Sequence, residues 1–248
     1  MNEVIYPEWW GKDSISSFVS SAYGNCVATL INYRNTLITG AMIAVNDVFK
    51  KGSQIKCNMD DEVLLPFFFG RSHGSYLGAV RLSISGQVPE SYALMRACIE
   101  NGLYALYVKS DSKISSGISE RAKTWTERHD GKEQMKKCRN EFANANVRKN
   151  LCEMDKELGR RISELYEFAI DCGAHPNVMG AITTSEISEN GVSVDILTRG
   201  DELVCKLAIQ RTVQVGICVF SIYQLIFQDR FSDIAKKLSE LHAYTENI

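Results

Sequence analysis

Proline is scarce in this chain, and its scarcity limits the fold more than any other property of the sequence. The chain has 248 residues and 4 prolines, whereas an average usage near 5% would give roughly 12. Proline breaks a helix interior because its ring removes a hydrogen-bond donor and clashes with the preceding turn, so a chain nearly free of it can form long helices. Pro66 and Pro89 fit the first turns of helices, and Pro176 follows a helix end.

Apolar residues recur at intervals of three or four along most of the chain, which is the helical period. The pattern predicts helices over about 14–52, 60–85, 89–108 and 119–129, a charged amphipathic stretch over 132–171 broken near 144–146, and a last helix over 201–244 kinked near 229–232. We therefore expect one all-α domain over 1–248, a multi-helix bundle of about five to seven helices.

Two segments depart from the helical pattern. Residues 182–188 and 192–197 alternate between apolar and polar side chains around Asn190-Gly191, and Asn-Gly between alternating runs is a strong signal for a hairpin turn. The sequence therefore predicts a β-hairpin insertion at 181–198. Residues 1–13 are expected to form a tail that docks through Tyr6, Trp9 and Trp10.

Net charge and cysteine usage restrict the partners and the cellular location expected for this chain. The net charge of -2 excludes a globally basic nucleic-acid binder. The eight cysteines are spread without a C-x-x-C pair, and the first residues lack a signal-peptide pattern, so we expect reduced thiols and a cytoplasmic location. The most apolar stretch, Thr212–Phe227, has 16 residues and is shorter than the roughly 20 of a membrane span. It predicts a buried core helix and no membrane association.

The predicted helix over 89–108 carries two charges among apolar neighbours. Arg96 and Glu100 are four residues apart, and apolar residues occupy nearly all faces around them. A helix that is apolar all round is normally buried, and a buried charge has to be paired. One interpretation is a structural ion pair between core helices, and the other is a polar site at the bundle centre.

The end of the predicted amphipathic helix is the second unusual spot. Tyr166 and Asp171 precede the helix end, and His175 lies just beyond it, where an imidazolium would meet the negative end of the helix dipole. Cys172 and His175 have the spacing of half a zinc site, but no second half is present. We therefore predict no metal and no cofactor, and we take His175 with Arg96 and Glu100 as the candidate catalytic residues.

Glycines and basic residues mark further candidate surfaces. Gly70, Gly74 and Gly78 share one helix face, which favours close packing of a neighbouring helix over a ligand groove. The candidate ligand-binding residues are Arg71, Arg81, Tyr104 and Tyr166. Residues 132–161 contain nine basic and five acidic residues, which is typical of a solvated face and, less commonly, of an RNA-binding strip.

Several segments together resemble a known group of proteins. Residues 70–73, 79–87 and 94–107, with 125–128 and 166–176, resemble an uncharacterised family of bacterial all-helical proteins over roughly residues 60–230. The resemblance implies a helical fold and no established activity.

More distantly, the chain resembles the HEPN superfamily of helical-bundle ribonucleases and toxin or defence proteins. Those ribonucleases use an arginine and a histidine separated by four to six residues, so that the histidine stands five to seven positions after the arginine. No histidine of this chain follows an arginine at that spacing. A HEPN-like site would therefore have to combine Arg96, Glu100 and His175 from separate helices.

The sequence thus leads to two main functional hypotheses. The first is a binding or interaction protein, compatible with a homo-oligomer, whose polar centre includes Arg96, Glu100 and His175. The alternative is a HEPN-like ribonuclease or nucleic-acid-directed defence or toxin protein, with RNA as its partner. A third is a pocket for a small apolar ligand between the helices over 60–85, 89–108 and 201–244.

Overall fold

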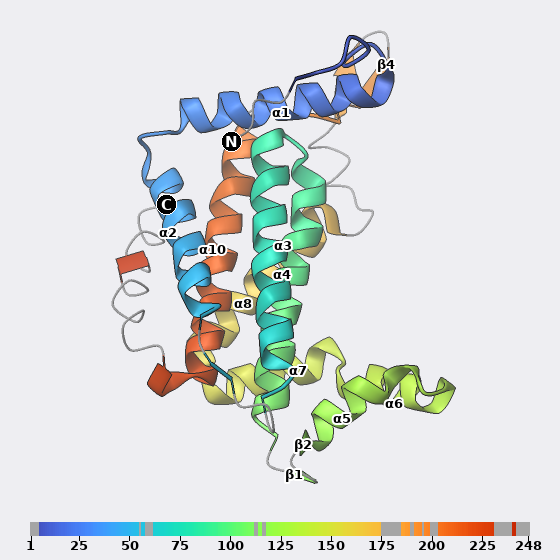
Figure 1. The fold of residues 1–248 in the computed structure, drawn as a ribbon, viewed down its shortest axis with the longest axis vertical. Coiled ribbons are helices and arrows are strands. Elements are labelled where there is room, and N and C mark those ends of the chain that lie inside the picture. The colour runs from blue at the N-terminus through green and yellow to red at the C-terminus, as the bar shows by residue number, and fades with distance from the viewer. Residues whose placement is uncertain are drawn as a thin grey trace.

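Two long helices, α3 (Leu65–Ser85) and α4 (Val88–Lys109), form an antiparallel hairpin around which the rest of the chain packs. The structure, a computed structural model, describes residues 5–54, 56–57, 62–111, 114–115, 118–174, 185–188, 191–194, 196–198, 203–230 and 240–241. Pro66 and Pro89 each lie in the first turn of their helix, as the sequence predicts. Figure 1 shows the hairpin at the centre of an all-α bundle.

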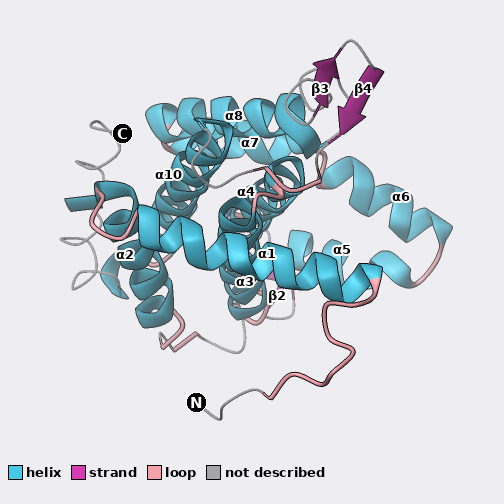
Figure 2. Ribbon diagram, turned by 90° about the horizontal axis from the view of Figure 1, so that it is seen from above, coloured by secondary structure: helices cyan, strands magenta, loops and turns pink. Residues whose placement is uncertain are grey.

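The remaining elements surround this hairpin. In chain order the described helices are α1 (Ser14–Asn32), α2 (Leu37–Gly52), α3, α4, α5 (Glu120–Thr126), α6 (Lys132–Glu141), α7 (Asn144–Met154), α8 (Lys156–Ala169) and α10 (Leu203–Ile226). Short 3₁₀ turns cover Glu127–His129 and Gln228–Arg230, and a π-helical turn covers Ile170–Ala174. α1 lies across one end of the bundle, and α5 and α6 form a lobe near the other end (Figures 1 and 2).

The apolar helix α10 fills the middle of the bundle. It packs against α4, α3, α2 and α8, and its Phe220 and Tyr223 are fully buried. Its length and composition would allow it to cross a membrane, but 61% of its most apolar window is buried inside the protein. This agrees with the predicted core helix. Phe220 and Tyr223 pack against Phe69 of α3 in the region where the third hypothesis placed an apolar ligand.

Polar groups inside this core are paired. The Tyr76 hydroxyl donates to the Met42 carbonyl at 3.0 Å, and the Ser72 and Tyr223 hydroxyls lie 3.0 Å apart. Satisfied polar groups of this kind fix how neighbouring helices align, because a misaligned partner would leave a buried group without a hydrogen bond.

Two of the predicted helices are divided in the structure. The segment over 14–52 turns between α1 and α2, where Thr36 caps α2 and donates its hydroxyl to the Tyr33 carbonyl at 2.8 Å. The amphipathic stretch breaks before Asn144, as expected, and again at Asp155, whose carboxylate accepts the Leu158 amide at 2.9 Å. Both unexpected breaks are side-chain caps that compete with a continuing helix.

The expected close packing of the α3 glycines is wrong at two positions. Gly70 and Gly74 are exposed, and a Cβ atom at either would meet nothing within 4 Å. Gly78 alone of the three approaches a neighbour, the side chain of Leu94 on α4.

The structure confirms the predicted β-hairpin but not the predicted docking of the N-terminal tail. Strands β3 (Ser185–Ser188) and β4 (Gly191–Val194) pair antiparallel, with Ser188 opposite Gly191, as expected for the hairpin. A second two-stranded pair, β1 (Ile114–Ser115) with β2 (Ile118–Ser119), precedes α5. In the tail, Tyr6 and Trp9 remain more than half exposed, and both rings lie against Trp10. The tail rings therefore cluster on one another and do not dock as predicted.

A buried carboxylate joins the chain ahead of α3 to the end of α10. Glu62 is 1% exposed, and it accepts hydrogen bonds from Arg230 at 2.7 and 3.0 Å and from Lys109 at 2.9 Å. A buried charge that loses its partner is strongly destabilising. This ion pair therefore ties together segments that are far apart in the sequence.

Replacing Arg230 with methionine is expected to lower the free energy of unfolding by about 2 kcal/mol, because the buried Glu62 would lose both hydrogen bonds from this guanidinium. Arg160→Met is the matched control, since Arg160 pairs with Glu157 and Glu164 where all three side chains are more than half exposed. That variant should change stability by less than about 1 kcal/mol. Urea denaturation measures both values, and equal effects would contradict the assignment.

His73 predicts a pH dependence of stability. Its ring stacks on Phe49 and its Nε2 lies 2.9 Å from Asn46 Oδ1, and burial together with Lys50 lowers its pKa below the ordinary 6.5. Below pH 6.5 the unfolded chain therefore binds a proton before the folded chain does, so this contribution to stability is lost as the pH falls. His73→Gln should lose less stability than the wild type between neutral and mildly acidic pH. Parallel acid titration curves would refute this role.

Candidate functional site

A polar stripe runs along one face of α4. Arg96, Glu100 and Tyr104 follow at intervals of four, which places them on the same side of the helix. Arg96 Nε lies 3.3 Å from Glu100 Oε1, and Tyr166 on α8 donates its hydroxyl to the same oxygen at 2.9 Å. The structure thus brings together three of the candidate residues, with Tyr104 one turn further on.

This cluster is shallower than the sequence predicts. The side chains of Arg96 and Glu100 are 27% and 30% exposed, whereas a helix that is apolar all round predicts full burial. α10 occupies the centre of the bundle, so the charged side of α4 meets α8 at the surface. The expected polar centre is therefore a surface seam.

The seam between α4 and α8 is held by contacts among its own residues. The Arg148 guanidinium lies over the Tyr166 ring at 5.1 Å and pairs with Glu167. Burial and the neighbouring Glu100 raise the pKa of Tyr166, so its hydroxyl stays protonated and keeps donating. The arrangement holds two helices together and favours the structural interpretation of Arg96 and Glu100.

The other candidate residues are not part of this seam. Arg71 and Arg81 are exposed on α3. His175 lies outside the described residues, so its expected position beside Arg96 stays a prediction.

Beyond Tyr104 the stripe leads into a pocket between α4, α5 and α6. The pocket has a volume of about 370 Å³, within the lower range of small-molecule sites. The residues that line it come from three separate segments: Tyr104, Trp125, Arg128, His129, Met135, Cys138, Arg139 and Phe142.

Aromatic rings form the wall of this pocket. Trp125 packs edge-on against Phe68 with ring centres 5.0 Å apart, and Phe142 meets Tyr104 edge-on at 5.2 Å. The Tyr104 hydroxyl also donates to the Phe142 carbonyl at 3.4 Å. Rings fixed on several sides offer a rigid planar surface.

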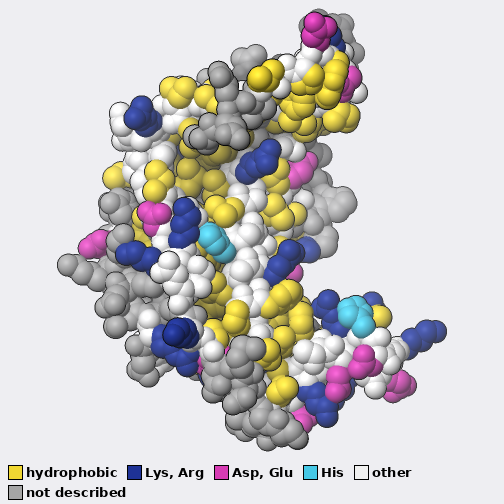
Figure 3. Space-filling model, viewed as in Figure 1, with side chains coloured by type: hydrophobic (Ala, Val, Ile, Leu, Met, Phe, Trp, Pro, Cys, Tyr) yellow, Lys and Arg dark blue, Asp and Glu magenta, His cyan; other side chains and the backbone are white. Residues whose placement is uncertain are grey.

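Basic groups stand beside the aromatic wall. The Arg128 guanidinium lies 4.8 Å from the Trp125 ring centre, and its Nε donates to His129 Nε2 at 3.0 Å. The terminal nitrogens of Arg128, like the whole guanidinium of Arg139, have no partner among the residues that the structure describes. No acidic side chain is among the residues that line this pocket. Figure 3 shows Lys and Arg side chains and a histidine on the upper side of the α5–α6 lobe.

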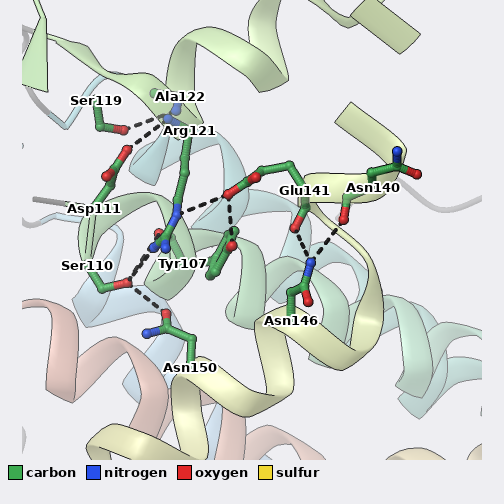
Figure 4. A network of polar contacts seen from close by, with 10 residues as sticks. All are labelled: Tyr107, Ser110, Asp111, Ser119, Arg121, Ala122, Asn140, Glu141, Asn146 and Asn150. Carbon is green, nitrogen blue, oxygen red and sulfur yellow. Dashed lines mark hydrogen bonds and ion pairs between the residues drawn. The ribbon is translucent and has the colours of Figure 1, made fainter. Parts of the chain in front are cut away.

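Arg121, near the pocket, is an arginine whose contacts are structural, in contrast to Arg128 and Arg139. Arg121 donates to the Tyr107 carbonyl at 2.9 Å and to Ser110 Oγ at 3.2 Å, pairs with Glu141 at 3.4 Å and covers the Tyr107 ring at 3.7 Å (Figure 4). Its donors face protein acceptors on several sides, which leaves little capacity for a ligand.

The network around Arg121 also positions the lobe. Ser119 caps α5 by accepting the Ala122 amide at 3.0 Å, and Asn146 on α7 donates to the carbonyls of Asn140 and Glu141 on α6 at 2.9 and 3.1 Å (Figure 4). These bonds hold α5, α6 and α7 at the end of α4. The pocket walls are therefore fixed before any ligand arrives.

Of the residues that line the pocket, Tyr104 alone was a sequence candidate, and the residues that give the pocket its chemistry, Trp125, Arg128, His129 and Arg139, were missed. The three-residue spacing of Trp125 and Arg128 is a local signal, because it places an arginine over an indole on one helical turn. Arg139 comes from a different helix, and no local pattern connects it with them.

Comparisons with protein-family models, with curated proteins and with solved structures find no match to this chain. The resemblance to a bacterial helical family and, more distantly, to HEPN proteins therefore stays a prediction. Among the described residues, no group of three or more His, Cys, Asp or Glu side chains is placed to hold a metal ion.

Proposed function

We propose that this protein is a binding protein that holds a phosphorylated nucleoside in the pocket between α4, α5 and α6. The observation that carries the proposal is the lining itself: two arginines and a histidine, no carboxylate, and a wall of aromatic rings. Nucleotide binding needs both halves, because the phosphate requires cationic donors and the base requires a flat surface.

Particular residues can be assigned to the phosphate and to the base. The terminal nitrogens of Arg128 form a planar fork that suits two phosphate oxygens, and Arg139 adds a second guanidinium. His129 accepts from Arg128 through Nε2, which leaves its Nδ1–H as a further donor. Trp125 and Tyr104 supply rings for contact with a base. A free nucleotide and a nucleotide within single-stranded RNA present the same chemistry.

We favour binding over catalysis because Arg96 is engaged by Glu100, whose carboxylate also accepts from Tyr166. An arginine held in this way has less capacity to neutralise a phosphodiester. The HEPN-like ribonuclease is the rival. Incubation of the wild type with RNA, with His175→Ala as the comparison, tests it: cleavage by the wild type that His175→Ala lacks would overturn the non-catalytic part of the proposal.

We also propose that the protein works in a reducing compartment such as the cytoplasm. All eight cysteines are free, and four of them are buried. Buried free thiols behave as small apolar side chains and persist where disulfides do not form.

Isothermal titration calorimetry with adenosine monophosphate, adenosine, inorganic phosphate and an RNA octamer tests the binding proposal. We expect adenosine monophosphate to bind at least about tenfold more tightly than adenosine, since one charge-assisted hydrogen bond is worth ~1.5 kcal/mol or more. The octamer distinguishes a free nucleotide from an RNA segment as the source. Equal affinities for the nucleoside and the nucleotide, or no binding of either nucleotide form, would overturn the proposal.

A further inference from the structure

Helix α1 carries an exposed apolar ridge. Its 19 residues contain no charged side chain. Ile15, Val19, Tyr23, Val27 and Ile31 are spaced by four and form a row that winds roughly 160° around the outer half of the helix, with Leu30 beside it. Ile15, Tyr23 and Ile31 are 71%, 61% and 66% exposed, and the other three are 37–40% exposed.

The ridge lies on a part of α1 that faces away from the bundle. α1 crosses the end of α3, where Asn25 donates to the Ser85 carbonyl at 3.1 Å. Thr29, on the same inner side, is 1% exposed. Figures 1 and 2 show the helix lying across the bundle with its outer side open, and Figure 3 shows hydrophobic side chains along this edge. Val19 and Tyr23 form the edge of the ridge nearest the bundle, since they also line a pocket between α1 and α3.

The exposed area approaches that of a stable interface. The six ridge side chains expose roughly 600 Å², compared with ~800 Å² per partner in a standard protein interface. Tyr6 and Trp9 of the tail, each more than half exposed, precede the same helix and add apolar surface. An exposed apolar surface of this size is at the upper end of what a monomer shows, and patches of that size are often functional.

We infer that the α1 ridge is the interface of a homodimer, with a second copy of this chain as its occupant. The ridge carries no charge, so it has no charged group with which a charged partner could pair. A second copy would bring the same uncharged ridge, and the two ridges could meet without like-charge repulsion. Ridges of residues spaced by four pack into the grooves between such ridges on another helix. Tyr23 is the middle residue of the ridge, so a two-fold axis there would let the same patch contact itself.

This inference is independent of the proposed nucleotide site. α1 lies at one end of the bundle, and the α5–α6 lobe lies near the other (Figure 1). Joining two copies through α1 would therefore leave both pockets open.

Sedimentation velocity of the wild type, Tyr23→Glu and Ser21→Glu over the micromolar range tests the inference. We expect a concentration-dependent dimer for the wild type and for Ser21→Glu, whose exposed position lies on the same helix outside the ridge. Tyr23→Glu should remain monomeric, with an unchanged circular dichroism spectrum and unchanged nucleotide affinity. Because the Tyr23 side chain is exposed, the change does not threaten the fold.

Three results would overturn the dimer. The first is a wild type that stays monomeric at every concentration. The second is an equal loss of dimer in Tyr23→Glu and Ser21→Glu. The third is a monomeric wild type that floats with phosphatidylcholine vesicles while Tyr23→Glu does not, since lipid would then be the occupant of the ridge.

Discussion

Replacing Arg128 with glutamine is expected to weaken the binding of adenosine monophosphate by about 100-fold, because the phosphate would lose a two-pronged charged donor worth ~3 kcal/mol. Arg128 has no ion pair among the described residues, so its loss should leave the free energy of unfolding nearly unchanged. Titration calorimetry measures the affinity, and urea denaturation measures the free energy of unfolding.

The matched control for Arg128 is Lys132→Gln. Lys132 is exposed at the start of α6 and does not line the pocket, yet both variants remove one positive charge from the same lobe. We expect less than about a twofold loss of affinity for Lys132→Gln. Equal losses in the two variants would mean that binding depends on the general charge of the lobe and not on a site.

Replacing Gly86 with alanine is expected to lower the free energy of unfolding by about 3–5 kcal/mol. Gly86 ends α3 with a φ of 87°, a conformation that disfavours any Cβ. A Cβ there would also collide with the backbone of Thr198, whose amide donates to the Gly86 carbonyl at 2.9 Å. The backbone cannot move aside without breaking this link between the α3–α4 turn and the chain that leads into α10.

Gly74→Ala is the control for Gly86→Ala and should have the opposite sign. Gly74 lies inside α3 with nothing within 4 Å of a new Cβ, so alanine should stabilise the helix by up to about 1 kcal/mol. Urea denaturation measures both variants. A destabilised Gly74→Ala would mean that the glycine face packs against something after all, and a neutral Gly86→Ala would contradict the described turn.

Local signals predicted much of the fold. The starts of α3 and α4 follow from prolines, and the pairing of β3 with β4 follows from the alternating residues on either side of an Asn-Gly pair, because each is decided by a few adjacent residues. The break between α1 and α2 was not predictable in this way. The apolar spacing continues through it, and the structure shows that the Thr36 cap begins a new helix where α1 crosses the bundle end.

The candidate site was predictable only in part. The spacing of Arg96 and Glu100 correctly indicated an ion pair, but its depth was wrong because the sequence does not show that α10 fills the bundle centre. Arg128 and Arg139 converge through a turn at 127–131 and the network around Arg121. A site assembled from separate segments by such contacts leaves no periodic pattern to read.

The central claim is that a nucleotide binds beside Trp125, and the fluorescence of that residue tests it most directly. The chain has three tryptophans, so a Trp9→Phe/Trp10→Phe variant leaves Trp125 as the single indole. Stacking or close approach of a base alters indole emission. We expect adenosine monophosphate to quench this emission to saturation, and adenosine at the same concentration to quench it far less. Emission that is unchanged while calorimetry detects nucleotide binding would place the ligand elsewhere and contradict the account.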